Sequence, residues 1–454
     1  MLPNYSVLNP NLERLSEKEV KALQTERLIN QVHHCYEHTA FWRTKFDEAH
    51  IRPDDIRSLE DLPKIPFSTK AELQKDQVDN PPFGSYLGVD SSRLVKYFST
   101  SGTTGRPIVR VYSDRDWSYV RSLFQRSPSL VPGDIAVLLG PTDGLLGPSA
   151  GVEGWEAMGA LVVRAARYST EEKIHLIHDL RPKMVCATAS FLLYLAETAQ
   201  KSKAPFSKIG GVPLLLSVGE PGAAIPATRE RLMRAWSAEV VIDGFGITEL
   251  FPLGNSCPEC ADTHIANDFM IVEVVDPEKD NPVEPGQRGE IVYTNIIGET
   301  QPLLRYRSRD IGRIAPFGPC PGCGSNATRI VGGIQGRVDD MVWYKGINIF
   351  PSAVEAVVRG LNELSNEFEI VLDQDGATQT LTVRAEVLAS CPTDRHEELK
   401  MRLEEKLMEA LEGVRAGVEL LEEGELPKTQ YKGRRVRDNR ASQGVGNTKN
   451  NPTK

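Results

Sequence analysis

The chain has 454 residues, a formal net charge of -9, 40% hydrophobic residues and 25% charged residues. Such a length exceeds what one core usually serves, so about two or three globular domains are expected. The acidic balance argues against a nucleic-acid partner, which usually meets a basic face. The sequence contains no apolar run of about 18 residues and no basic, apolar leader, so we expect no membrane span and no signal peptide, and place the protein in the cytoplasm.

Apolar runs and helical patterns alternate along the first part of the chain. Residues 17–50 have helical periodicity, and prolines punctuate the segment after them. Between about 130 and 250 the alternation favours a parallel sheet with crossover helices. Strands are expected at 135–139, 184–187, 212–218 and 240–242, and helices at 169–180, 190–200 and 227–236. From 268 to about 315 strand patterns dominate, so a β-rich subdomain is expected within a first domain of residues 1–335.

A smaller unit is expected over residues 336–438. Residues 352–359 begin a helix, and two strand patterns at 367–373 and 378–387 flank an Asp-Gly turn. An amphipathic helix follows at 397–411. Strands with packed helices over roughly 100 residues indicate a small α+β lid domain. Residues 439–454 are polar without apolar periodicity, which predicts a disordered tail.

A loop rich in glycine and hydroxyl side chains lies between expected strands at 94–98 and 108–112. Its residues are Ser99, Thr100, Ser101, Gly102, Thr103, Thr104, Gly105 and Arg106. Glycine permits tight backbone turns, and successive N–H groups can converge on an anion, so this loop can cradle a polyphosphate. It is not a Walker A loop, because no Gly-Lys-Ser/Thr ending follows. Taken alone, such a loop is more often a mobile surface turn.

Two Cys-x2-Cys pairs are the clearest metal signal in the sequence. They are Cys257 with Cys260, and Cys320 with Cys323. Two such pairs suit a tetrahedral zinc ion, and four protein ligands would make the zinc structural. His264 is an alternative ligand in place of one cysteine. Four free thiols are the competing interpretation, and a redox pair explains two such motifs less well.

Further segments follow the glycine loop in a fixed order, and together they resemble the adenylate-forming superfamily. These segments are Ser217–Pro221, Asp243–Glu249, Arg305–Asp310, Gly336–Asp340 and Leu426–Val436. In that superfamily a Ser-Ser/Thr-Gly-Thr-Thr-Gly-Lys-Pro loop grips the ATP phosphates. Arg106 stands here where the lysine is usual, which keeps the charge but not its geometry.

The resemblance implies roles for single residues in nucleotide binding. It implies that Phe245 stacks on adenine, that Thr248 contacts phosphate in the catalytic site and that Glu249 ligates Mg²⁺, in keeping with an aromatic face for a flat base and a carboxylate for a hard cation. It implies that Asp310 binds both ribose hydroxyls. Further nucleotide contacts are implied for Gly219, Glu220, Pro221, Asp243, Gly244, Gly246 and Arg337.

The last part of the resemblance concerns the lid domain. It implies that Asp339 is the hinge between two domains and that Lys432 is the catalytic lysine, with Lys428 as a weaker alternative. Gly346 would leave room for the pantetheine arm of coenzyme A. The implied fold is α/β: a large N-terminal adenylate-forming domain with parallel sheets, helices and a β-rich subdomain, followed by a small mobile α+β C-terminal lid domain.

Within the superfamily the sequence resembles the phenylacetate–CoA ligases. The segments that carry this likeness are Leu62–Phe67, Arg305–Asp310 and Asn348–Ser352. The resemblance implies activation of an aromatic acid by ATP and Mg²⁺ as acyl-AMP, then transfer to coenzyme A. The expected acid pocket includes Thr142, Asp143, Leu145 and Gly147. Two departures stand out: the stretch 140–148 replaces a Tyr-Gly-Leu-Phe-like segment, and Phe245 replaces a common tyrosine.

Two other functions remain open from the sequence. One is an aryl-acid adenylating enzyme that passes its acyl group to an amine or a carrier protein. The other is a nucleotide-binding regulator without catalysis, against which the joint presence of Glu249, Asp310 and Lys432 argues. The sequence leaves the oligomeric state undecided, with a homodimer as the assembly considered.

Overall fold

The computed structural model describes residues 10–100, 107–126, 130–220, 222–338, 341–344, 347–375, 378–411, 413–427 and 435–440. The chain divides into two compact units, Met1–Val338 and Asp339–Lys454. Each unit has hydrophobic clusters of its own. No helix in the described ranges combines the length and the apolar character needed to cross a membrane.

The first unit opens with helices that pack on one another. A capping box of Ser16 and Glu19 begins α2, since each side chain accepts a hydrogen bond from the other's backbone N–H. Trp42 and Phe46 of α3 are fully buried against α2. The elements here are α1 (Pro10–Glu13), α2 (Glu17–His38), α3 (Ala40–Glu48), η1 (Pro53–Asp55), η2 (Leu59–Lys64), α4 (Lys70–Asp79) and η3 (Ser91–Arg93).

An eight-stranded sheet forms the centre of the first unit, in the order β13-β9-β8-β7-β6-β5-β3-β4. Pairing is parallel from β4 to β7 and antiparallel from β7 to β13. The strands are β3 (Ile135–Leu138), β4 (Leu161–Arg164), β5 (Met184–Ala187), β6 (Leu214–Val218), β7 (Val240–Ile247), β8 (Phe251–Ser256), β9 (Thr263–Ile265) and β13 (Thr328–Ile330). The parallel sheet expected from the alternating pattern is confirmed.

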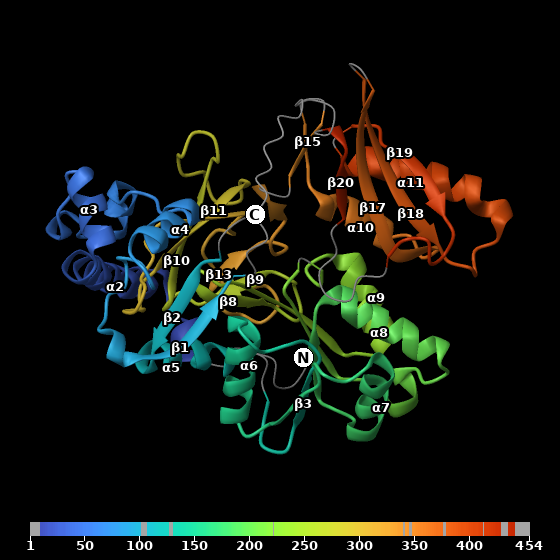
Figure 1. Cartoon of the computed structure of the whole chain (residues 1–454), viewed down its shortest axis with the longest axis horizontal. Helices are drawn as coiled ribbons and strands as arrows, with labels where there is room; N and C mark the ends of the chain where they lie inside the picture. Colours follow the sequence, from blue (N-terminus) through green and yellow to red (C-terminus); the bar gives the residue numbers. More distant parts are fainter. Residues whose placement is uncertain are drawn as a thin grey trace, which may run out of the picture. The chain divides into compact units, whose positions relative to one another are not determined.

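Helices cover both faces of the parallel half of this sheet (Figure 1). Val185, Leu215 and Val241 pack under one group of helices, whereas their chain neighbours face the opposite cluster, as strand alternation requires. The first group is α7 (Thr170–Leu180), α8 (Ala189–Lys201) and α9 (Pro226–Trp236), with η4 (Phe206–Ile209). The opposite cluster includes side chains of α6 (Leu146–Ala157), which packs beside α5 (Asp114–Phe124).

Two smaller antiparallel sheets complete the first unit. One is a hairpin of β1 (Leu94–Ser99) and β2 (Val109–Ser113). The other has the order β10-β11-β12-β14 and is the β-rich region expected from the sequence. Its strands are β10 (Met270–Val275), β11 (Gly289–Asn295), β12 (Tyr306–Gly312) and β14 (Gly336–Arg337).

The second unit is α+β, as expected. A four-stranded sheet of order β19-β18-β17-β20 packs its apolar side chains with those of α10 and α11. Its long hairpin carries more residues than the sequence pattern indicated. The elements are β15 (Val342–Tyr344), β16 (Ile347–Ile349), α10 (Pro351–Arg359), β17 (Leu364–Asp375), β18 (Thr378–Val387), η6 (Thr393–Arg395), α11 (His396–Ala410), β19 (Gly417–Leu421) and β20 (Val436–Asp438). The expected tail lies outside the described residues from position 441 onward.

Candidate nucleotide site and cysteine cluster

The glycine loop connects β1 to β2 within the first unit. Ser99 pairs with Val109 at the end of β1. Thr100 closes the base of the loop: its N–H donates to the Ile108 carbonyl at 3.0 Å, and its Oγ1 accepts the Ile108 N–H at 3.0 Å. Positions 101–106, which include Gly102, Gly105 and Arg106, lie outside the described residues. The described residues on either side of the loop are therefore hydrogen-bonded to each other at the end of the hairpin.

The two central nucleotide motifs meet at one edge of the large sheet. In the parallel register of β6 and β7, Ser217 faces Asp243 and Val218 faces Gly244. Gly219 and Glu220 therefore leave β6 at the same edge where Gly244 and Phe245 leave the parallel ladder. Such carboxyl edges of parallel strands are where open α/β sheets bind ligands. Pro221 lies outside the described residues.

Glycine is required where these two strand ends approach. A Cβ on Gly244 would lie 2.9 Å from Cγ1 of Val218, closer than real side chains come. Gly219 has a φ of +90°, a left-handed conformation that other residues adopt only at a cost. These two positions explain why the motifs need glycine, independently of any ligand.

Asp243 is buried at this edge. Burial raises the pKa of its carboxyl to about 8, against the opposing effects of the Arg229 charge and the Ala223 backbone N–H. Within the described ranges its Oδ1 has no hydrogen-bond partner. Its own backbone N–H donates to Oγ of Ser256 at 2.8 Å, which ties β7 to the end of β8. The carboxyl is therefore held neutral inside the fold up to about pH 8.

Thr248 and Glu249 lie in the turn between β7 and β8, and Glu249 has an unanticipated partner. Nζ of Lys70 lies 3.3 Å from Oε1 of Glu249, whose side chain is 9% exposed. Lys70 is the first residue of α4. A cation is disfavoured at a helix N-terminus, so its placement there is a local cost. A lysine at this unfavourable position, shortly after the Leu62–Phe67 segment, is a local signal in the sequence for a partner elsewhere in the fold.

The backbone holds Lys70 in this position. The N–H of Ser68 donates to the Arg305 carbonyl at 3.1 Å, and the N–H of Arg307 donates to the Ser68 carbonyl at 2.9 Å. The Arg305 guanidinium also lies over the Phe67 ring, with its carbon 4.0 Å from the ring centroid. The segment before α4 is thus pinned to the strand that leads to Asp310.

Asp310 lies on β12 and is 2% exposed. Arg337 faces it in the antiparallel register of β12 and β14, and its Nη1 donates to Oδ1 of Asp310 at 2.9 Å. The hydroxyl oxygen of Ser308 accepts the backbone N–H of Asp310 at 3.0 Å. The structure therefore brings together Asp310 and Arg337, both expected from the sequence, with the carboxylate oriented by a neighbouring strand.

The expected acid-pocket residues lie after β3, on the same carboxyl edge as the nucleotide motifs. The Leu145 N–H donates to the Thr142 carbonyl at 3.0 Å and forms a tight turn before α6. Asp143 is exposed, and Gly147 is in the first turn of α6. Two strands, β5 and β6, separate this loop from Phe245 on β7.

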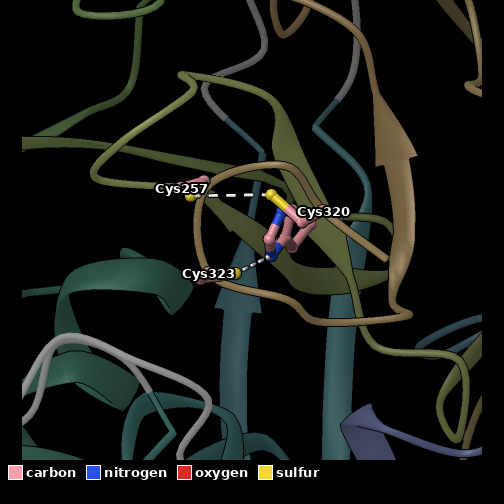
Figure 2. Close-up of side chains that lie close together, drawn as sticks. Cys257, Cys320 and Cys323 are labelled. Carbon is pink, nitrogen blue, oxygen red and sulfur yellow. Dashed lines mark hydrogen bonds between the residues drawn. The ribbon is translucent and has the colours of Figure 1, made fainter. Parts of the chain in front are cut away.

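The two cysteine pairs form one cluster, although about 60 residues separate them in the sequence. Figure 2 shows Cys257, Cys320 and Cys323 turned toward one another. The Sγ atoms of Cys257 and Cys320 are 3.8 Å apart, and Sγ of Cys323 lies 3.9 Å from Nδ1 of His264. The ligand atoms of these four residues all lie within 4.8 Å of one another. Cys260 lies beside them, its Sγ 3.3 Å from that of Cys320.

Each cysteine pair is a tight turn. The Ala261 N–H donates to the Cys257 carbonyl at 3.1 Å, and the Gly324 N–H donates to the Cys320 carbonyl at 2.9 Å. Ala261 and Gly324 have left-handed φ values of +61° and +74°. A Cβ on Gly322 would lie 2.7 Å from Cβ of Glu259 and 3.1 Å from Sγ of Cys257, so the close approach of the two turns leaves no room for a side chain here.

The thiols of the cluster influence one another. Hydrogen bonds from Cys260 and Cys323 lower the pKa of the Cys257 thiol. Hydrogen bonding to Cys257 raises the pKa of the Cys260 thiol. The cluster thus favours a thiolate at Cys257, the form of cysteine that binds metal. All seven cysteines of the chain are free of disulfides.

Four expected site residues of the second unit are not described. Asp339, Gly346, Lys428 and Lys432 all lie outside the described residues. Their roles stay predictions.

Comparison with known proteins gives the class of this chain. Residues 15–296 match the AMP-binding enzyme family, and residues 346–440 match the AMP-binding enzyme C-terminal domain. The chain therefore belongs to the AMP-binding enzyme family. The resemblance to adenylate-forming enzymes drawn from the motifs is confirmed.

Similar proteins narrow the class. The chain is 33% identical over 453 residues to a phenylacetate-coenzyme A ligase of Aromatoleum evansii, covering 96% of this chain and 98% of that protein. It is 31% identical over 449 residues to a phenylacetate-coenzyme A ligase of Escherichia coli K12, covering 94% and 96%. The crystal structure of a 2-hydroxyisobutyryl-CoA ligase in the postadenylation state superposes with a TM-score of 0.88 at 28% identity, covering 95% of this chain and 92% of that one.

Proposed function

We infer that this protein is an AMP-forming acid–CoA ligase. It activates a carboxylic acid with ATP to an acyl-adenylate and transfers the acyl group to coenzyme A. The observation that carries this function is the match to CoA ligases along nearly the whole chain. The site geometry agrees with it, because Phe245, Glu249 and Asp310 are all presented by the first unit.

The first step is attack of the acid carboxylate on the α-phosphate of ATP, with release of pyrophosphate. Positioning and electrostatics supply most catalysis in such phosphoryl chemistry. Asp310, held by Arg337, suits two ribose hydroxyls, because an ionised carboxylate only accepts hydrogen bonds. We propose that Thr248 contacts phosphate and that Phe245 stacks on adenine. Gly219, Glu220, Gly246 and the glycine loop would complete the nucleotide site.

We propose Mg²⁺ as the metal of the first step, with Glu249 as a protein ligand. The residue fits, because its side chain ends in hard oxygens and is nearly buried. When bound, Mg²⁺ supplies positive charge to the phosphates of ATP. Lys70 already pairs with this carboxylate, so the chain places a second cation at the same position.

The second step transfers the acyl group from acyl-AMP to the thiol of coenzyme A, which loses its proton, and AMP leaves. We propose that residues 1–335 and 336–438 act as two domains that rearrange about Asp339 between the steps. The division of the chain into units between Val338 and Asp339 supports a junction there. In this proposal Lys432 serves the adenylation step and Gly346 admits pantetheine. Lys432→Ala is expected to abolish pyrophosphate exchange and to spare thioester formation from added acyl-adenylate; loss of both would contradict that assignment.

The acid is proposed to be aromatic, with Thr142, Asp143, Leu145 and Gly147 near its pocket. The names of the curated relatives support an arylacetic acid. A short branched 2-hydroxy acid is the second candidate, because the solved structure with 28% identity is a 2-hydroxyisobutyryl-CoA ligase. The exposed Asp143 and the neighbouring Thr142 offer polar groups to either class.

A structural zinc ion is proposed for the cysteine cluster. Tetrahedral zinc–thiolate bonds of about 2.3 Å separate two sulfurs by roughly 3.8 Å. Cys257 and Cys320 are 3.8 Å apart, which supports them as ligands. The grouping of His264 with Cys257, Cys320 and Cys323 supports the histidine in place of Cys260. These residues would fix two loops; they form no part of the reaction.

We propose that the protein is cytoplasmic and that it can form a homodimer. Seven free cysteines are consistent with the reducing cytoplasm. A homodimer is testable by analytical ultracentrifugation of the full chain.

Pyrophosphate exchange across aryl, arylacetic and 2-hydroxy acids, with and without coenzyme A, tests the function. We expect exchange with one acid class and AMP formation coupled to coenzyme A. Absence of exchange with every acid would overturn adenylation. Exchange without thioester formation would favour transfer to an amine or a carrier protein instead.

A further inference from the structure

Arg229 connects two segments that the sequence keeps apart. It lies near the start of α9, and its Nη2 contacts three backbone carbonyls. The acceptors are Val241 at 2.6 Å, Cys257 at 3.1 Å and Pro258 at 3.1 Å. Val241 belongs to β7, and the other two belong to the first cysteine turn. One guanidinium nitrogen therefore spans the nucleotide strand and the cysteine cluster.

This contact lies where the β7–β8 ladder ends. The antiparallel register runs from Ile247 opposite Phe251 to Gly244 opposite Asn255. Continued by the same rule, it would set Val241 opposite Pro258, but no ladder pair forms there. Arg229 donates to Val241 of β7 and to Pro258 in the turn after β8 at this position. It replaces missing main-chain hydrogen bonds with a side-chain bridge.

Partial burial of the Arg229 guanidinium gives this bridge an electrostatic cost. Desolvation lowers the pKa of the Arg229 guanidinium, opposed by Asp243 and by two cysteines of the cluster. Its Nη1 has no hydrogen-bond partner within the described ranges. An arginine removed from water is normally matched to a carboxylate, because its charge is expensive to desolvate. Here its hydrogen bonds go to backbone carbonyls of strand β7 and of the first cysteine turn.

The strand that Arg229 holds leads directly into the nucleotide motif. From Val241 the chain passes Asp243 and reaches Gly244, Phe245 and Glu249 within eight residues. The cysteine turn begins one residue after β8 ends at Ser256. Arg229 thus connects the Cys257 carbonyl by hydrogen bonds to the strand before Phe245.

We propose that Arg229 is a positioning residue. It couples the folded conformation of the cysteine cluster to the ATP affinity of the nucleotide site at the end of β7. The proposal rests on the proposed nucleotide-binding function. Arg229 touches no reacting atom: it sets the distance between β7 and the Cys257–Cys260 turn. Zinc loss or cysteine substitution would then weaken ATP binding through Arg229.

A double-mutant cycle on the full chain tests the coupling. Arg229→Gln, Cys323→Ser and the double variant are compared with wild type by ATP dissociation constant, zinc content and Tm. Each single change is expected to raise the ATP dissociation constant about tenfold. The double variant is expected to bind ATP no more weakly than the single variant with the lower ATP affinity. Glu230→Gln, an exposed neighbour on α9, is the matched control and is expected to bind ATP as wild type does.

Additive effects, with the double variant weakened about a hundredfold, would overturn the coupling. So would unchanged ATP affinity in Arg229→Gln. Where a cysteine variant does not fold, zinc removal by a chelator replaces it: the loss of ATP affinity is expected in wild type and absent in Arg229→Lys, and an equal loss in both overturns the proposal.

Amide hydrogen exchange without ATP separates this inference from the proposed function. Faster exchange over residues 240–249 is expected in Arg229→Gln and in Cys323→Ser, with no further increase in the double variant. Unchanged exchange in either single variant overturns the coupling. Failure of wild type to bind ATP would instead overturn the nucleotide-binding function.

Discussion

Two acidic residues of the first unit have different cationic partners. Asp310 is oriented by Arg337 from the adjacent strand, with a 2.9 Å hydrogen bond inside a sheet. Glu249 pairs at 3.3 Å with Lys70, whose side chain is 36% exposed and comes from a helix far away in sequence. Arginine fixes the geometry of a carboxylate, whereas lysine is a flexible point charge. The arrangement at Asp310 suits a carboxylate that holds a ligand in a fixed geometry. The arrangement at Glu249 suits a carboxylate that can exchange its lysine for another cation.

The largest expected effect comes from a change at Glu249. Glu249→Gln removes the proposed Mg²⁺ ligand but keeps the shape, and we expect the pyrophosphate exchange rate to fall by about a hundredfold to a thousandfold. Added Mg²⁺ should restore part of that rate. Glu230→Gln serves as the exposed control. A near-normal rate in Glu249→Gln would show that this residue holds no essential cation.

Asp310→Asn is expected to act on binding more than on rate. Hydrogen bonds to a charged group contribute about 1.5–3 kcal/mol, so the dissociation constant for ATP should rise about tenfold to a hundredfold. The KM for the acid should stay unchanged. Calorimetric titration with ATP measures the first quantity. An unchanged ATP affinity would remove Asp310 from the ribose site.

Lys70→Met tests whether the second cation takes part. We expect the KM for ATP to rise about tenfold, because a charge near the phosphates is lost. The Mg²⁺ concentration for half-maximal rate should fall, because no lysine competes for Glu249. Lys64→Met is the matched control, since Lys64 is 54% exposed and pairs with Asp61 instead. Equal behaviour of the two variants would reduce Lys70 to a surface residue.

Arg337→Lys should have a smaller effect. The charge beside Asp310 survives, but the guanidinium geometry that orients the carboxylate is lost. We expect the dissociation constant for ATP to rise a few-fold, with kcat unchanged. If the loss instead matched that of Asp310→Asn, Arg337 would have to contact the nucleotide itself.

A third carboxyl, Asp243, has the smallest expected effect on activity and a distinct pH signature. Its folded pKa is about 8, above the unfolded value of 3.8, so between these values the folded state holds a proton that the unfolded state has lost. Its contribution to stability therefore falls as pH rises through this window. Asp243→Asn mimics the neutral acid, and its Tm should exceed that of wild type by more at pH 8 than at pH 5. A pH-independent difference would show that Asp243 is ionised in the fold.

The sequence predicted the sheet well and the contacts between distant segments poorly. Strands such as β5 are uniformly apolar, so the pattern located them at the observed residues. The strand expected at 240–242 extends to Ile247. Gly244 and Gly246 interrupt the apolar pattern in this stretch, so the pattern does not indicate its pairing with β8. The cysteine spacing predicted a cluster, but only the fold brought His264 to Cys323.

The partners of the site residues could not be predicted in the same way. Lys70 and Glu249 lie far apart in the sequence, and Arg229 contacts carbonyl groups, which carry no side-chain signature. Such contacts depend on register and on how helices dock, and neither is encoded in a local pattern. Asp310 was found because its motif is local, and its partner Arg337 because it lies in a second local motif.

The pairing of Ser68 with Arg305 and Arg307 sets a limit on how the enzyme can be shortened. A chain begun at residue 71 would keep the glycine loop, both motifs of the large sheet and the cysteine pairs, yet it would lack the cation opposite Glu249 and the strand-like segment beside β12. The short segment from Ser68 to Lys70 is thus part of the site's construction rather than an appendage to it. During synthesis of the chain, Ser68 is made more than two hundred positions before Leu304, to whose carbonyl its hydroxyl donates a hydrogen bond. This part of the site therefore cannot form until the later segment has been made.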